Sequence, residues 1–136
     1  MTFRASHPLR FAHCDPAGIA YYPRYLEICD AAVEDWTAEV LGVPRRVLHL
    51  DMALALPTVK LEAEFTAVSR LGDLLDIALD VVAVGRTSVD LHAAVTSRGR
   101  ERFAVGYRQV LVEMPEGTSR PWPEEWRVRL EREMAS

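Results

Sequence analysis

One segment with a helical repeat, followed by a long stretch in which apolar and polar residues alternate, constrains the fold of this chain most. Between Tyr22 and Gly42, large apolar side chains recur at the spacing of one helix face, and the charged residues fall mainly on the other. Pro23 suits a first helical turn, and Gly42 suits the position just past a helix end. We predict one amphipathic helix of about 20 residues, roughly 30 Å long. Its apolar stripe is expected to consist of Tyr22, Tyr25, Leu26, Cys29, Val33, Trp36 and Val40.

From Thr58 onward, apolar residues recur at every second position instead of at the helical spacing. Four runs of alternating apolar and polar residues are separated by short breaks that contain glycine, which is typical of an antiparallel meander. A further strand is predicted from Phe3 to Ala12, and a short charged helix from Glu124 to Met134. The positions on the repeating face of the four runs, apolar except for Gln109, are Val59, Leu61, Ala63 and Phe65; Leu75, Ile77, Leu79, Val81 and Ala83; Val89, Leu91, Ala93 and Val95; and Phe103, Val105, Tyr107, Gln109 and Leu111.

This order of elements predicts the α+β class, with one long helix packed on one face of an antiparallel sheet. Such a sheet has edges and a second face that need protection, and association of several copies is the simplest way to supply it. The chain is expected to form a single domain over residues 1–136.

Composition excludes several classes of protein. With 16 basic and 20 acidic residues and a net charge of −4, the chain does not have the charge of a dedicated nucleic-acid binder. No apolar run approaches the ~18 residues of a membrane span, and the N-terminal residues lack the apolar core of a signal peptide. The 2 cysteines make neither a disulfide framework nor a metal site. We expect a cytoplasmic protein without nucleic-acid or membrane partners.

The segment before the predicted helix combines three features that suit chemistry. Asp15 precedes a proline and is therefore biased to an extended backbone, and Gly18 allows a left-handed turn. The segment leads into a helix N-terminus, where free N–H groups favour negative charge. A carboxylate beside such a site suits acyl transfer, although Asp-Pro before a helix is also a common turn or cap.

The same segment resembles the signature of the hotdog-fold thioesterases, in particular the 4-hydroxybenzoyl-CoA thioesterase branch. The resemblance extends loosely to about Glu113 and implies a hotdog fold, in which an antiparallel five- or six-stranded sheet wraps one long helix. It also implies a homodimer or homotetramer. The residues that carry the resemblance are Phe11, Cys14 to Ile19, Tyr22, Pro23 and Tyr25, and less specifically Asp30 to Ala32, Leu71 to Asp73 and Gly85 to Ser88.

The resemblance implies hydrolysis of an aromatic or medium-size acyl-CoA to the free acid and CoA. Asp15 would act as the nucleophile or as the general base that activates water, and both roles stay open. The backbone N–H of Tyr22 would polarise the thioester oxygen, and Gly18 would let the loop approach the acyl group. No metal and no cofactor are expected, because CoA arrives as part of the substrate.

Two candidate substrate-binding residues flank this segment. His13 stands where many relatives carry an acid, and on an extended segment it would point the same way as Asp15 and favour the ionised carboxylate. An exposed histidine at a strand end is the alternative. Asp30 lies at the border of the apolar stripe, where it could accept a hydrogen bond from a ring hydroxyl or remain solvated.

Two further candidates lie on the predicted strands. Thr58 begins the strand that, by the resemblance, faces the active-site loop of a dimer partner. Arg86 lies in a turn and could bind CoA phosphates, although most of the many arginines here are expected to be solvated. A hydratase or isomerase with one Asp base, and a non-catalytic acyl-CoA-binding protein, are the alternative functions.

Overall fold

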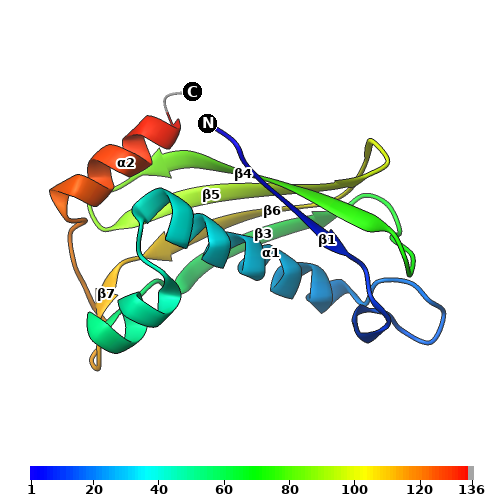
Figure 1. Ribbon diagram of the computed structural model, residues 1–136, viewed down its shortest axis with the longest axis horizontal. Helices are drawn as coiled ribbons and strands as arrows, with labels where there is room; N and C mark the ends of the chain where they lie inside the picture. The colour runs from blue at the N-terminus through cyan, green and yellow to red at the C-terminus, as the bar shows by residue number, and fades with distance from the viewer. Residues whose placement is uncertain (135–136) are drawn as a thin grey trace.

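The computed structural model describes residues 1–134. A curved antiparallel sheet packs against one long helix, and a second helix packs near the chain termini (Figure 1). The last two residues of the predicted single domain lie outside the described residues. The elements of this main layer are α1 (Tyr22–Trp36), α2 (Glu124–Met134), β1 (Phe3–Pro8), β3 (Thr58–Phe65), β4 (Leu74–Val84), β5 (Ser88–Ser97) and β6 (Arg100–Val110).

The five-stranded sheet has the order β1-β4-β5-β6-β3, with antiparallel neighbours throughout. The predicted meander is confirmed for β4, β5 and β6 but is wrong for β3, which pairs with β6 rather than with β4. Alternation of apolar and polar residues identifies a strand, but it does not show which other strands pair with it. Because β1 occupies the free edge of β4, β3 lies at the opposite edge of the sheet.

Several short elements fall between the predicted ones. The strand predicted to reach Ala12 ends at Pro8, and a 3₁₀ turn follows. A small sheet with the order β2-β7-β8 lies beside the main one. The bounds of these elements are Phe11–His13 for the 3₁₀ turn, Thr37–Leu41 and Val47–Asp51 for two wide helical turns, Leu54–Ala55 for β2, Val112–Glu113 for β7 and Thr118–Ser119 for β8.

The predicted helix is confirmed, with its α-helical part ending at Trp36 and a wider turn leading to Gly42, which adopts φ 73°. Most of the predicted stripe is buried, together with Ile28 and Ala32. Leu26 and Val40 are partly buried, and Tyr22 has 60% of its surface exposed because its ring lies against Phe65, which is itself 52% exposed.

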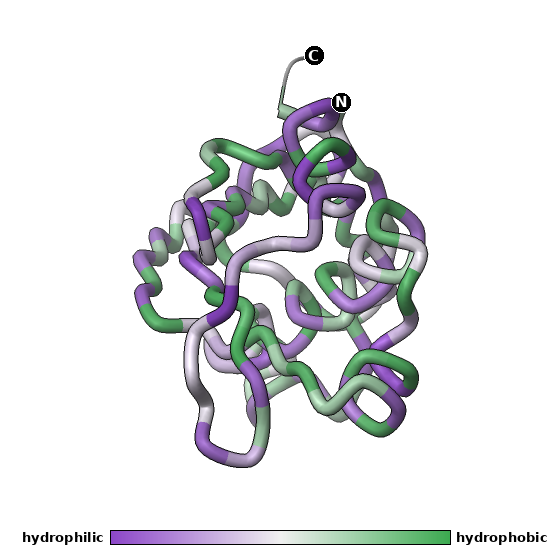
Figure 2. The backbone as a smooth tube through the Cα atoms, turned by 90° about the vertical axis from the view of Figure 1, so that its left-hand side faces the viewer, coloured by the Kyte–Doolittle hydropathy of each residue, from purple (hydrophilic) through white to green (hydrophobic). Residues whose placement is uncertain are grey.

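The core lies between the helix and the sheet, where the apolar residues of β4, β5 and β6 alternate as predicted. Figure 2 shows the resulting alternation of hydropathy along the backbone. Ala83 is exposed, because a register shift after Val81 changes the alternation at the end of β4. The charged helix α2 is present as predicted, and its Trp126 and Leu130 are buried. Within residues 1–134, no helix has the length and apolarity needed to cross a membrane.

Strand β3 does not follow the expected burial. Its apolar residues Val59, Leu61 and Phe65 have 58%, 44% and 52% of their surface exposed, and Ala63 is only partly buried. The strand pairs on one side only, so its other edge is free, and these side chains are left largely uncovered. A long apolar edge strand of this kind is a surface that folded proteins normally cover.

Candidate active site

Asp15 lies in a small hairpin between β1 and α1. The backbone of Cys14 bridges Ala20, and the N–H of Asp15 donates to the carbonyl of Ile19 at 2.9 Å. At the tip, the N–H of Gly18 donates to the carbonyl of Asp15 at 3.0 Å, and Gly18 adopts φ +74°. The turn therefore requires a residue that accepts the left-handed region, as the sequence predicted for Gly18.

The carboxylate of Asp15 is anchored through one of its two oxygens. Oδ1 accepts hydrogen bonds from the N–H of Ala17 at 2.9 Å and of Ile19 at 3.3 Å. The side chain is half-buried, and within residues 1–134 no hydrogen bond occupies Oδ2. One oxygen thus orients the group, while the other remains able to face a reactant.

The segment 68–73 holds this hairpin from its other side. The N–H of Ala20 donates to the carbonyl of Ser69, and the N–H of Leu71 donates to the carbonyl of Gly18, both at 2.9 Å. Behind the segment, Arg102 is buried and donates from Nη1 to Ser69 Oγ at 3.3 Å and to Asp73 Oδ2 at 2.8 Å. The side chain of Arg102 therefore connects the segment that holds the Asp15 hairpin to the sheet.

The first turn of α1 offers a backbone donor beside this loop. The backbone N–H of Arg24 donates to the carbonyl of Tyr21 at 2.8 Å, and Pro23 has no N–H. The N–H of Tyr22 makes no hydrogen bond within residues 1–134, and it lies at the positive end of the helix. The ring of Tyr22 lines a cavity of about 410 Å³ with Tyr25 and the segment 65–69. Asp15 does not line this cavity in the single chain.

His13 is not placed as the extended-strand prediction required. Residues 11–13 form a 3₁₀ turn, so the two-residue spacing no longer aligns His13 with Asp15. Its Nδ1 accepts the N–H of Arg10 at 2.9 Å, and its ring meets that of His7 at a centroid distance of 5.2 Å. Burial, with a smaller effect of His7, lowers the pKa of His13, which favours the neutral ring.

Asp30 and Thr58 line one cavity, of about 220 Å³, together with Arg45 and Gln109. Asp30 is exposed in the single chain, yet local burial is the largest influence on its carboxyl and raises its pKa, while Arg45 opposes the rise. The structure therefore brings together two residues that lie 28 positions apart in the sequence and were predicted separately as substrate contacts.

Within one chain, the predicted site residues fall into two groups. Asp15, Gly18 and Tyr22 lie at the end of the sheet where β4 begins. Thr58 and Arg86 lie at the other end, since Thr58 pairs with Gln109 and Arg86 lies in the turn between β4 and β5. Arg86 is exposed.

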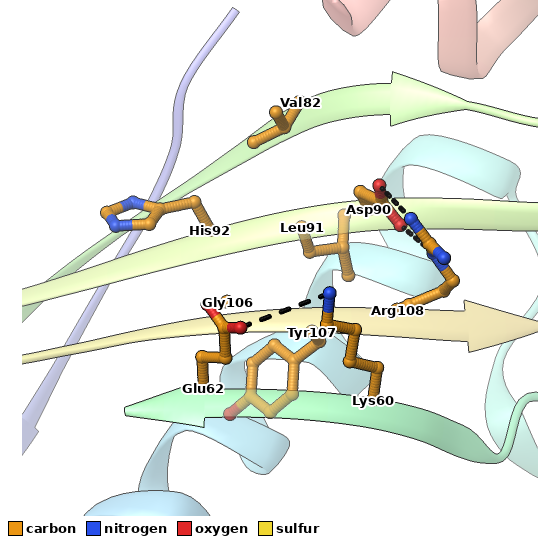
Figure 3. A pocket seen from close by; sticks show the side chains of 9 residues that line it. All are labelled: Lys60, Glu62, Val82, Asp90, Leu91, His92, Gly106, Tyr107 and Arg108. Atoms are coloured by element: carbon orange, nitrogen blue, oxygen red, sulfur yellow. Dashed lines mark hydrogen bonds and ion pairs between the residues drawn. The ribbon is translucent and has the colours of Figure 1, made fainter. Parts of the chain in front are cut away.

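A separate hollow of about 230 Å³ lies on the sheet face opposite α1 (Figure 3). It lies over Gly106 and is bordered by ion pairs between Lys60 and Glu62 at 3.9 Å and between Arg108 and Asp90 at 2.8 Å. It contains none of the predicted site residues, and its charged groups already pair with one another.

Sequence reasoning missed Arg45, Gln109 and Arg102. Gln109 carried a usable signal, because it is a polar residue at an inward position of an alternating strand. Arg45 lies in the segment between α1 and β3, where the sequence shows no periodicity. Arg102 resembled a solvated turn residue, and only its contacts show that it is buried.

We predict that the Asp73–Arg102 ion pair contributes less to the free energy of unfolding as the pH falls. A hydrogen bond from the N–H of Arg70, together with Arg102, lowers the pKa of Asp73 in the folded protein. The ionised carboxylate of Asp73 stabilises the fold fully above its pKa in the unfolded state, about 3.9. This stabilisation is lost as the pH falls from there through the lower pKa of Asp73 in the folded protein. In urea unfolding from pH 6 to pH 3, we expect the stability difference between the wild type and Asp73→Asn to shrink. A constant difference would contradict the prediction.

Comparison with known proteins agrees with this architecture. The model of the family described as the thioesterase-like superfamily matches residues 9–130. A 1,4-dihydroxy-2-naphthoyl-CoA hydrolase of Synechococcus elongatus is 33% identical over 101 residues, which are 74% of this chain and 63% of that protein. The match thus spans less than two thirds of the length of this relative.

Two solved structures share the fold. The 1,4-dihydroxy-2-naphthoyl-CoA thioesterase from Synechocystis has a TM-score of 0.84 at 21% identity, with 96% of each chain covered. The 4-hydroxybenzoyl-CoA thioesterase from Pseudomonas sp. strain CBS-3 has a TM-score of 0.86 at 20% identity, with 94% of this chain and 98% of that chain covered. The long helix and its antiparallel sheet are those of a hotdog-fold protein. The chain belongs to the thioesterase-like superfamily.

Proposed function

We propose that the protein hydrolyses the thioester of an aromatic acyl-CoA to the free acid and CoA. One observation carries this proposal. The loop that holds the half-buried carboxylate of Asp15 through one oxygen leads directly to a helix start, where the N–H of Tyr22 has no hydrogen-bond partner within residues 1–134. The names of the relatives support the substrate class, because they act on hydroxylated aromatic CoA thioesters.

The chemistry needs few groups. The thioester oxygen accepts a hydrogen bond from the Tyr22 N–H, which stabilises the negative charge that develops on it. Asp15 either attacks the carbonyl carbon through Oδ2, forming an anhydride that water then hydrolyses, or removes a proton from an attacking water. In both cases the C–S bond breaks and CoA leaves as a thiolate, which takes up a proton released from the attacking water. Labelled water oxygen found in Asp15 after a single turnover would indicate the anhydride route, because only the anhydride exposes the carboxyl carbon of Asp15 to attack by water.

The test is release of free thiol from a panel of CoA esters with benzoyl, hydroxybenzoyl, dihydroxynaphthoyl, phenylacetyl and straight-chain acyl groups. We expect the aromatic esters to be cleaved with the highest kcat/KM. Binding of these esters without thiol release would contradict hydrolysis and favour an acyl-CoA-binding protein. Hydration of an enoyl-CoA without thiol release would favour a hydratase.

We also propose that two copies associate through β3. The exposed apolar residues of β3 and its unpaired edge support this arrangement. Antiparallel pairing of two β3 edges would join the sheets and place the Thr58 end of one strand at the Phe65 end of the other. The two groups of site residues would then meet across the interface, with His13, Asp30, Thr58 and Arg86 as substrate contacts.

Leu61→Lys is expected to weaken this dimer. Leu61 is 44% exposed in the single chain, so lysine is tolerated there but would meet the apolar strand of the partner. We expect the dissociation constant in sedimentation equilibrium to rise about 30-fold or more, the effect of an interface hot spot. Val128→Lys, at an exposed position on α2, is the matched control. Equal effects of the two variants would argue against the β3 interface.

A further inference from the structure

His13 lies at one end of a short ladder that joins the Asp15 hairpin to the start of α1. The ladder pairs residues 13–15 with residues 19–21, and its last hydrogen bond runs from the N–H of Tyr21 to the carbonyl of His13 at 2.9 Å. Asp15 is in one strand of this ladder, and Tyr22 directly follows the other. The position of His13 therefore helps to fix where the carboxylate lies relative to the Tyr22 N–H.

The side chain of His13 ties this end of the ladder to the 3₁₀ turn before it. The N–H of Arg10 donates to Nδ1 of His13 at 2.9 Å, and the N–H of His13 donates to the carbonyl of Arg10, also at 2.9 Å. The imidazole thus acts as the N3 side chain of a capping box, which reaches back to the N-cap N–H. Loss of the Nδ1 hydrogen bond would loosen the turn and, with it, the end of the ladder.

This hydrogen bond requires a neutral ring. A backbone N–H can only donate, so Nδ1 of His13 must be unprotonated, and the ring carries its proton on Nε2. The neighbouring His7 has the opposite arrangement, because its Nδ1 lies 2.8 Å from the carbonyl of Pro8, which can only accept. Protonation of His13 would place a second N–H against that of Arg10 and break the cap.

The surroundings of His13 favour the neutral ring. The charged groups that face it are His7 on β1, Arg10 in the 3₁₀ turn, and Arg24 and Glu27 on α1. Burial is the largest influence and lowers the pKa of His13; protonated His7, Arg24 and Arg10 lower it further, and only Glu27 opposes them. The cap is therefore complete above the ordinary histidine pKa of about 6.5 and is lost as the pH falls through the lower pKa of the folded protein.

We propose that His13 is a positioning residue, whose neutral imidazole holds the Asp15 carboxylate and the Tyr22 N–H in their catalytic arrangement. The proposal rests on the thioesterase function proposed above. Protonation of the ring releases the N–H of Arg10, loosens the ladder and lowers kcat, so turnover is sensitive to mild acid. This role uses Nδ1 and leaves Nε2 for the substrate contact.

The experiment compares His13→Asn with His13→Leu at saturating substrate. Asparagine keeps an acceptor near the place of Nδ1 but does not titrate, whereas leucine has no acceptor. At pH 7.5, we expect His13→Leu to reduce kcat by about tenfold, because a small displacement of reacting groups is costly, and His13→Asn to recover most of this loss. Saturating substrate keeps a loss of substrate contacts in KM and leaves the positioning effect in kcat.

The pH profile separates positioning from a merely structural role. For the wild type, kcat should fall by about threefold or more between pH 7.5 and pH 5.5. In His13→Asn, the same interval should leave kcat nearly constant. His7→Asn is the matched control: it removes a neighbouring cation, so the acid loss should persist and move to higher pH.

Nuclear magnetic resonance of the ¹⁵N-labelled protein tests the coupling without turnover, and circular dichroism at pH 7.5 checks the fold of each variant. The ring nitrogens of His13 report its titration, and the amide signals of Arg10 and Tyr21 should move with the same midpoint in the wild type but not in His13→Asn. If no ester is cleaved but these amides follow His13, the thioesterase proposal fails and the coupling of His13 to the helix start stands.

Three results would overturn the positioning role. The first is an amide signal of Arg10 that does not respond to the titration of His13. The second is an acid loss of kcat that persists in His13→Asn or disappears in His7→Asn, since either would assign the titration to another group. The third is a change of KM alone in His13→Leu, which would leave His13 as a substrate contact only.

Discussion

Asp15→Asn is expected to reduce kcat for thioester hydrolysis by at least about 100-fold, the lower range for removal of a general acid or base. Asparagine is nearly the same size, and its Oδ1 can still accept the N–H groups of Ala17 and Ile19 that orient Asp15. The substitution therefore removes the reactive oxygen while retaining the hairpin. The measurement is thiol release under saturating substrate, with thermal unfolding as the check on the fold.

A control on the same loop separates chemistry from loop geometry. Gly18→Ala introduces a side chain at φ +74°, where no other atom lies within 4 Å of the added carbon, so backbone strain is its main effect. We expect a smaller loss of kcat than for Asp15→Asn. Turnover by a folded Asp15→Asn variant at the wild-type rate would remove Asp15 from the mechanism.

Arg102→Met is expected to lower the free energy of unfolding by about 3–5 kcal/mol, the cost of leaving one partner of a buried ion pair uncompensated. The Arg102 and Asp73 side chains are only 10% and 14% exposed, and their atoms lie 2.8 Å apart. The substitution also removes the donor to Ser69, whose hydroxyl accepts Tyr25 Oη–H at 2.6 Å. Urea denaturation followed by circular dichroism measures the loss.

Arg108→Met is the matched control for this prediction. Arg108 also pairs with an aspartate on the sheet, Asp90, but the two side chains are 48% and 30% exposed. An ion pair in contact with water contributes little, so a much smaller loss of stability is expected. Similar losses in the two variants would contradict the assigned role of Arg102. The carbonyl of Ser69 also accepts a hydrogen bond from the N–H of Ala20 in the hairpin that carries Asp15. Arg102→Met should therefore reduce turnover even in conditions where the protein remains folded.

The elements with a strong local repeat could be predicted from the sequence. The apolar spacing from Tyr25 to Trp36 predicted α1, and the alternation from Leu75 to Tyr107 predicted three consecutive strands. The turn at Gly18 before the helix start could also be predicted, because Pro16, Gly18 and the helix start are close together in the chain and act through the local backbone, whereas the small hairpin formed by Cys14 and Ala20 was not predicted.

Only part of the candidate site could be predicted from the sequence. Asp15, Gly18 and the Tyr22 amide come from one continuous segment, so their common placement in the loop before α1 and in its first turn could be predicted from the sequence. Arg45 and Gln109 are 64 positions apart and meet Asp30 only because β6, α1 and the segment before β3 pack together. His13 shows the opposite case, where a 3₁₀ turn replaced the strand geometry on which its expected alignment with Asp15 depended.

By itself, the sequence determined the long helix, the long strands and the place where a carboxylate precedes a helix start. These features depend on residues within about four positions of one another, whose periodicity and turn preferences act locally. Only the tertiary structure decided that β3 lies at the sheet edge with its apolar residues exposed, and that Arg102 is buried against Asp73. Strand order and burial depend on how distant segments compete for the same neighbours, and no short stretch of sequence contains that information.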